Sequence, residues 1–152
     1  MKISAIDTVI YIADANALAY RSFHAIRGLS TSTGHATNAL YGFLSTILKI
    51  MKERRPAFLA AAFDTPQPTF RHRMFAEYKI QRPPMPEALA GQLPAIREGL
   101  SLLGIRSIEH PGVEADDIIA TIADTFSRQG IHICIITPDK DALQLLSDMV
   151  TI

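Results

Sequence analysis

The chain has no tryptophan and a single cysteine, and its 15 acidic side chains balance its 15 basic ones. Cys134 lies in the apolar run IHICIIT. One cysteine cannot form an internal disulfide, so we expect a reducing compartment. Because isoleucine recurs at alternating positions around Cys134, we interpret this residue as a buried strand residue rather than a catalytic thiol.

Signals for export or for the membrane are also missing. The N-terminal stretch carries Asp7 and Asp14 within its apolar part, which is not typical of a signal peptide. No segment approaches the roughly 18 apolar residues of a membrane span. We therefore expect a cytoplasmic protein without a membrane partner. Zero net charge argues only weakly against a nucleic-acid partner, because local charge layout matters more than the sum.

Short apolar runs alternate with segments of helical period, and 48% of the residues are hydrophobic. This alternation predicts one α/β domain with a mostly parallel central sheet flanked by helices. The expected strands are residues 9–15, 58–64, 105–110, 132–138 and 149–152. The expected helices are residues 17–26, 38–55, 86–104, 112–130 and 139–147, with Pro94 able to split the third.

The given sequence stops in the apolar run MVTI. An α/β domain more often closes with a helix, so we expect residues 1–152 to be an incomplete domain.

Seven carboxylates share one kind of place, the carboxyl end of an expected strand or the helix start beside it. In parallel sheets, ligands bind outside these strand ends. Two like charges about 4 Å apart repel by roughly 4 kcal/mol at an effective dielectric constant near 20, so the group requires a cation. Oxygen ligands without paired Cys or His favour Mg²⁺ or Mn²⁺. The candidate metal ligands are Asp14, Asp64, Glu114, Asp116, Asp117, Asp139 and Asp141.

Each acid alone has a simpler explanation. Acids in the first helical turn favour the helix dipole. Asp139 can cap the following helix, and Asp64 can begin a turn with Pro66. For seven acids at matching places, a metal site is the better interpretation, and two ions suit phosphodiester hydrolysis. Asp141 and Glu114 are the members we expect most readily to face solvent.

The stretch TFRHRMFAEYKIQRPP mixes cations with aromatic rings. Cations hold phosphates and rings stack on bases, so the stretch suits a nucleic-acid strand. An ordinary solvated helix with a buried aromatic edge is the alternative. Arg21, on the helix after Asp14, is a further candidate for a phosphate contact.

In combination, five segments resemble the N-terminal half of the 5′-nuclease domain of bacterial DNA polymerase I and its stand-alone 5′–3′ exonuclease relatives, in the flap endonuclease superfamily. The segments are IADANALAYRSFHAI, TNALYGFLSTILKIMKE, AAFDTPQPTFRHRMFAEYKIQRPPMPE, GVEADDIIATIA and ITPDKDALQLLSD. The resemblance covers nearly the whole chain. It implies a PIN-like fold and divalent-metal hydrolysis of DNA at a 5′ end or 5′ flap, in replication and repair.

The resemblance also implies roles for single residues. The seven acids would serve two Mg²⁺ or Mn²⁺ ions, directly or through water. Arg21, Arg71 and Lys79 would be the catalytic groups. Arg21 and Arg71 match positions near the scissile phosphate, and Lys79, with Arg82, matches the helical gateway through which a single 5′ strand passes. The expected DNA contacts are Tyr20, Arg21, Arg71, Tyr78, Lys79 and Arg82. The C-terminal half of the family's nuclease domain, which grips duplex DNA and adds two aspartates, is absent from this sequence, and a polymerase module is a further expected partner.

Three alternatives stay open. A PIN-type RNA endonuclease has a similar fold and acid cluster but lacks the YKxxRP motif that Lys79 and Arg82 belong to. A truncated DNA-binding remnant would bind flaps without cleaving them. A phosphoacceptor receiver domain requires paired acids after the first strand, where this chain has only Asp14.

Overall fold

The computed structural model describes residues 8–152. Residues 1–7, which are part of the segment in which we expect no signal peptide, lie outside the described residues. Five parallel strands form one sheet in the order β3-β2-β1-β4-β5. The strands are β1 (Val9–Asp14), β2 (Phe58–Ala62), β3 (Arg106–Ile108), β4 (His132–Ile136) and β5 (Val150–Thr151). The predicted parallel sheet is confirmed.

The central strands are apolar on both faces, because helices cover both sides of the sheet. In β1, Ile12 packs into one core and its neighbour Ala13 into the other. The same division separates Ala62 from Ala61 in β2. Successive side chains of a strand point to opposite faces, so a continuous apolar run feeds two cores.

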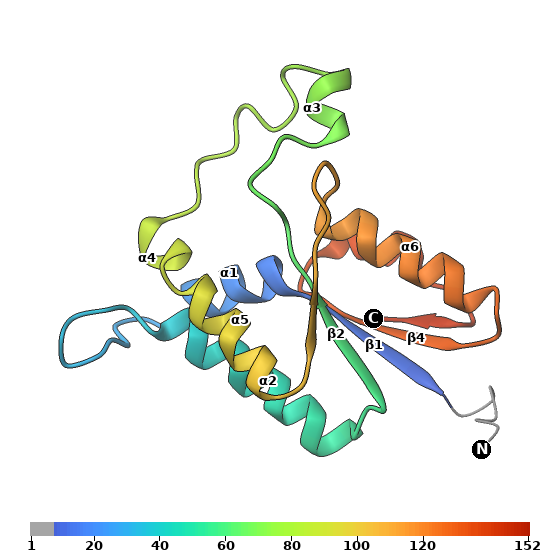
Figure 1. The fold of residues 1–152 in the computed structure, drawn as a ribbon, viewed down its shortest axis with the longest axis horizontal. Coiled ribbons are helices and arrows are strands. Elements are labelled where there is room, and N and C mark those ends of the chain that lie inside the picture. The colour runs from blue at the N-terminus through green and yellow to red at the C-terminus, as the bar shows by residue number, and fades with distance from the viewer. Residues whose placement is uncertain (1–7) are drawn as a thin grey trace.

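Helices α1 (Ala15–Ala25), α2 (Asn38–Arg54) and α5 (Leu93–Leu102) lie on one side of the sheet, and α6 (Ala115–Ser127) lies on the other (Figure 1). Phe43 and Ile47 of α2 are fully buried in the first core. Ile119 and Ala123, one helical turn apart on α6, line the second core. The apolar period of each helix therefore selects the face that meets the sheet.

Helices α1 and α2 approach each other at Gly42. A Cβ atom at this position would lie 2.7 Å from Cβ of Ser22 and 2.9 Å from Cδ1 of Ile26. Only glycine allows the two backbones to come this close without displacement. Next to this contact, the buried Asn38 donates to the carbonyls of Phe23 and Ile26, which anchors the start of α2 against the end of α1.

Besides shifts of a few residues at the ends of elements, the structure differs from the predicted one in three respects. The expected helix 86–104 is two helices, α4 (Glu87–Ala90) and α5, and Pro94 lies in the first turn of α5, where its missing N–H costs nothing. The expected helix 139–147 is a 3₁₀ turn, η2 (Lys140–Leu145). Cys134 was expected to be buried but is only half-buried on β4.

Residues 65–86, which we call the arch, leave β2 and stand away from the sheet before the chain returns to α4 (Figure 1). The arch carries the short helix α3 (Phe70–Met74). Met74, Phe75 and Ile80 on it are exposed. Within residues 8–152, none of the helices combines the length and apolar character that a membrane crossing requires.

Candidate active site

The parallel strands place four acids at one edge of the sheet. Asp14 is the last residue of β1, Asp64 follows β2, and Asp139 follows β4. Asp116 stands in the first turn of α6. We call these four residues the acidic group, because the charges of Asp14, Asp64 and Asp139 all act on Asp116.

Asp14 is the most buried acid of the group, with 4% of its surface exposed. One carboxylate oxygen accepts a hydrogen bond from the N–H of Ala17 at 3.0 Å and so caps α1. The other accepts from the hydroxyl of Thr137 at 2.9 Å. Burial raises the pKa of Asp14, while the two hydrogen bonds oppose this rise.

Asp64 is held from two sides. Its carboxylate accepts a hydrogen bond from the N–H of Ala115 at 2.8 Å, at the start of α6. Its own N–H donates to the side-chain oxygen of Asn16 at 3.3 Å. These contacts connect the end of β2 to both α1 and α6, so the carboxylate has a defined place between them.

Asp116 carries the strongest sign of mutual repulsion. Partial burial, together with the negative charges of Asp14, Asp139 and Asp64, raises its pKa to about 6. The positive charge of Lys79 lowers the pKa by a smaller amount. An acid with a raised pKa in a group of like charges is the situation that a bound cation relieves.

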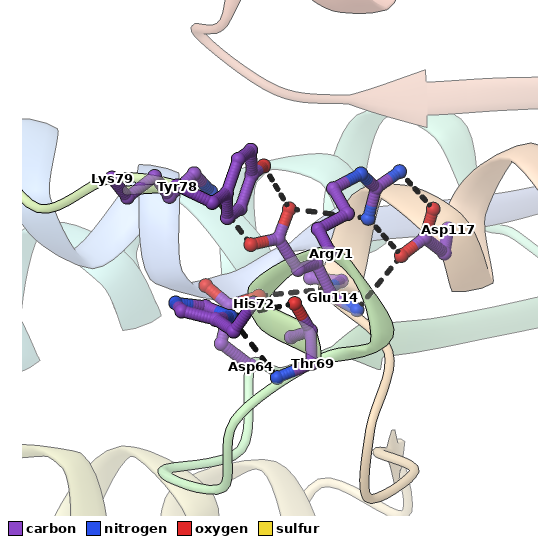
Figure 2. A network of polar contacts seen from close by, with 9 residues as sticks. Asp64, Thr69, Arg71, His72, Tyr78, Lys79, Glu114 and Asp117 are labelled. Carbon is purple, nitrogen blue, oxygen red and sulfur yellow. Dashed lines mark hydrogen bonds and ion pairs between the residues drawn. The ribbon is translucent and has the colours of Figure 1, made fainter. Parts of the chain in front are cut away.

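A second set of contacts attaches the arch to α6, and we call it the arch network (Figure 2). The guanidinium of Arg71 donates to both oxygens of Asp117, at 2.7 and 2.6 Å. Lys79 donates to Glu114 at 2.8 Å, and the hydroxyl of Tyr78 donates to the other oxygen of Glu114 at 3.0 Å. Arg71 also lies 3.5 Å from Glu114. Asp117 of α6 and Glu114, the residue that caps the start of this helix, thus hold three side chains of the arch.

Ionisation in the arch network follows from these pairs. The hydrogen bond from Arg71 lowers the pKa of Asp117, and the pKa of Arg71 is raised in return. Burial opposes the charged form of Lys79, but the hydrogen bond and charge of Glu114 outweigh it and raise its pKa. Lys79 also has a φ of 58°, a left-handed conformation that is uncommon outside glycine.

A pocket of about 280 Å³ lies beneath the arch network. Arg82, Lys79 and His72 line it together with Asp64 and Glu114. The ring of His72 packs edge-on against Tyr78, and its Nδ1 lies 2.9 Å from the hydroxyl of Thr69. Cations and carboxylates therefore share one pocket at the base of the arch.

The seven predicted metal ligands do not form one group. The charges of Asp14, Asp64 and Asp139 act on Asp116, whereas Glu114 and Asp117 pair with cations of the arch. The expectation that Glu114 faces solvent was wrong, because 9% of it is exposed. Asp141 is exposed, as expected, and its N–H donates to Asp139, which caps η2.

Tyr20 and Arg21 lie away from the arch network. Tyr20 stacks near His24 on α1, with ring centroids 6.3 Å apart. Arg21 lines a groove of about 590 Å³ between α1 and α2, with Lys49 and Arg54. Two residues that the sequence analysis did not consider, Asn16 and Thr137, contact the acids directly.

The donor set fits a hydrated divalent cation. Across residues 8–152, no three Asp, Glu, His or Cys side chains are arranged to hold a metal ion by themselves. Mg²⁺ keeps several waters and is bound through one or two carboxylates, so coupled carboxylates of this kind satisfy its requirements. Zn²⁺ prefers Cys and His, which the acidic group does not contain.

The model of the N-terminal resolvase-like domain of 5′–3′ exonucleases matches residues 9–152. The chain belongs to this family. Its N-terminal resolvase-like domain accounts for the parallel sheet and for the position of the acids at the strand ends.

Curated relatives of this exonuclease-domain chain are similar over almost its whole length. The 5′–3′ exonuclease of Aquifex aeolicus is 48% identical over 94% of the chain and 50% of that protein. The thermostable DNA polymerase I of Thermus aquaticus is 43% identical over 93% of the chain and 17% of the polymerase. The chain thus spans half or less of the length of these relatives.

Solved structures support the same fold. The T5 D15 protein, co-crystallised with metal ions, superimposes with a TM-score of 0.67 at 23% identity, over 93% of this chain and 52% of that one. The T5 5′-exonuclease with bound zinc gives a TM-score of 0.66 at 24% identity, over 93% and 53%. The predicted PIN-like α/β fold of the 5′-nucleases is therefore confirmed.

Proposed function

We propose that the chain is the metal-binding part of a nuclease that hydrolyses DNA phosphodiester bonds at a 5′ end or 5′ flap. The observation that carries this proposal is the convergence of Asp14, Asp64, Asp116 and Asp139 beside the cationic arch. Membership in the exonuclease-domain family supports it. So does a related T5 flap endonuclease that was crystallised with DNA and metal ions.

The acidic group would hold a divalent cation, which we propose is Mg²⁺ or Mn²⁺. A complete site would hold two such ions. When bound, the metal supplies Lewis acidity toward water and a phosphate oxygen. Asp14 and Asp64 are well suited to hold it, because hydrogen bonds already fix their carboxylates. Glu114, Asp117 and Asp141 would act through water, since two of them pair with arch cations and the third is exposed.

The arch would bind the DNA strand. Lys79 and Arg82 line the pocket next to Asp64, so a phosphate there would meet cations on one side and the acidic group on the other. Arg71 lies on the same network and would contact the neighbouring phosphate. Tyr78 offers a ring for stacking. The proposed roles of Tyr20 and Arg21 depend on DNA that continues over α1.

A cleavage assay with matched substrates tests this function. A 5′-labelled DNA flap, and an RNA flap of the same sequence, are incubated with the chain and Mg²⁺, alone and with the C-terminal half of a relative's nuclease domain added. We expect cleavage of the DNA flap, abolished by EDTA. Preferred cleavage of RNA would favour a PIN-type RNA endonuclease, and flap binding without cleavage under all conditions would favour a DNA-binding remnant.

A further inference from the structure

Thr137 connects two acids that come from different strands. It lies directly after β4, 123 residues along the chain from Asp14. Its hydroxyl donates to the Asp14 carboxylate at 2.9 Å. The same oxygen accepts the N–H of Asp139 at 3.1 Å.

The chemistry of the three groups fixes the direction of both bonds. A backbone N–H can only donate, so the Thr137 oxygen must accept from Asp139. An ionised carboxylate can only accept, so the single hydroxyl proton of Thr137 goes to Asp14. Pro138 has no N–H, which makes the N–H of Asp139 the first one available after Thr137. The Thr137 hydroxyl therefore donates to Asp14 and at the same time accepts from Asp139.

The hydrogen bond from Thr137 completes the contacts that orient the Asp14 carboxylate. Ala17 binds one of its oxygens and Thr137 binds the other. The carboxylate of Asp139 is held in turn by the N–H of Asp141 at 2.9 Å. One hydroxyl thus sets the separation between a buried acid of β1 and the loop that carries the acid after β4.

We propose that Thr137 is a positioning residue, whose hydroxyl orients Asp14 and Asp139 toward a shared divalent cation. This inference rests on the proposed function, since it concerns the same acids. Hydrogen-bonded partners of metal-binding carboxylates commonly contribute tenfold or more to metal affinity. A hydroxyl that only stabilised the end of β4 would not change metal affinity.

The test measures the Mn²⁺ affinity of residues 1–152 by calorimetric titration, together with the unfolding temperature in EDTA. Thr137→Val keeps the shape of the side chain and removes the hydroxyl, and Thr137→Ser restores the hydroxyl. We expect Thr137→Val to weaken Mn²⁺ binding roughly 10- to 100-fold, and Thr137→Ser to bind as wild type does. Thr137→Ala replaces the valine variant if that one does not fold, with the same expectation.

Thr46→Val is the matched control, because the hydroxyl of Thr46 donates to the Gly42 carbonyl at 2.8 Å within α2, outside the acidic group. It should leave Mn²⁺ affinity unchanged. Wild-type affinity in a folded Thr137→Val or Thr137→Ala variant would overturn the inference and leave the proposed function standing. A serine variant as weak as the valine variant would also overturn it. Absence of Mn²⁺ binding by the wild-type chain would reject both together.

Discussion

Arg71 of the arch and Asp117 of α6 form a bidentate ion pair, with both terminal guanidinium nitrogens within 2.7 Å of a carboxylate oxygen. The pair joins residues 46 positions apart in the sequence. Asp117 also accepts the N–H of Glu114 at 2.9 Å, so it stabilises the start of α6 as well. One carboxylate therefore links the arch to the helix that carries Asp116.

This pair should be measurably stronger than an ordinary surface pair. A double-mutant cycle with Arg71→Met and Asp117→Asn, read by urea unfolding, should give a coupling energy of about 1 kcal/mol, because two parallel charged hydrogen bonds are lost together. Arg128 and Asp124 form an ion pair of the same residue types and serve as the control. Both of their side chains are more than half exposed, so water weakens their interaction. Their coupling should be about 0.5 kcal/mol or less. Equal coupling in the two pairs would contradict this view of the arch.

Glu114 should govern the mobility of the arch. Glu114→Gln removes the negative charge that Lys79 and Tyr78 bind. Amide hydrogen exchange of residues 70–82 should become about fivefold faster, which corresponds to about 1 kcal/mol for a weakened charged hydrogen bond. Glu109→Gln, which breaks the exposed pair with Arg97, serves as the control and should leave the arch unchanged. Unchanged exchange in Glu114→Gln would show that the arch is held by other contacts.

The metal-free chain should lose stability as pH rises through the range in which Asp116 ionises. The pKa of Asp116 is about 6 in the folded chain, against an ordinary value of 3.8. The folded state therefore binds the proton more tightly, and unfolding becomes easier between these two values as pH increases. In EDTA, Asp116→Asn should remove part of this slope and raise the free energy of unfolding at neutral pH by on the order of 1 kcal/mol after solvent screening.

Asp124→Asn, on the exposed face of the same helix, is the comparison for this measurement. It should keep the wild-type slope. A wild-type chain whose stability does not fall over this pH range, or an Asp116→Asn variant with the same slope as wild type, would contradict the electrostatic coupling of the acidic group.

Replacing Gly42 with a larger residue should destabilise the fold, because a side chain there would collide with α1. Alanine is normally the better helix former by up to about 1 kcal/mol. At Gly42, however, the new methyl would lie 2.7 Å from the Cβ of Ser22, so Gly42→Ala should lower the free energy of unfolding by about 1–3 kcal/mol. Gly91→Ala meets only the Glu87 carbonyl at 3.4 Å and should be nearly neutral. A neutral Gly42→Ala variant would mean that α1 and α2 separate easily.

The fold was predictable because each strand is a short apolar run and segments of helical period stand between most of the strands. The positions of Asp14, Asp64 and Asp139 followed from the same alternation, since parallel strands end at one edge. A break in the helix expected at 86–104 was anticipated from Pro94, which lies in the first turn of α5. The contacts of Gln92 at this break were not accessible, because it bonds the Leu40 N–H and Asn38, which become its neighbours only in the folded chain.

The division of the acids was not accessible from the sequence either. Glu114 and Asp117 stand beside Asp116 in the sequence, and all three fit one metal site by type and spacing. Which of them face the other acids and which face the arch depends on where Arg71 and Lys79 lie in space. Thr137 left only a weak signal, a hydroxyl at a strand end next to Pro138.

The central claim is that the acidic group supports metal-dependent DNA cleavage. The most direct measurement is Mg²⁺-dependent cleavage of a 5′-labelled DNA flap by wild type, Asp14→Asn, Asp116→Asn and the control Asp124→Asn, each with the C-terminal nuclease half of a relative added. We predict that wild type and Asp124→Asn cleave equally, and that Asp14→Asn and Asp116→Asn lose cleavage while remaining folded. Cleavage at the wild-type rate by either of these two variants would contradict the account.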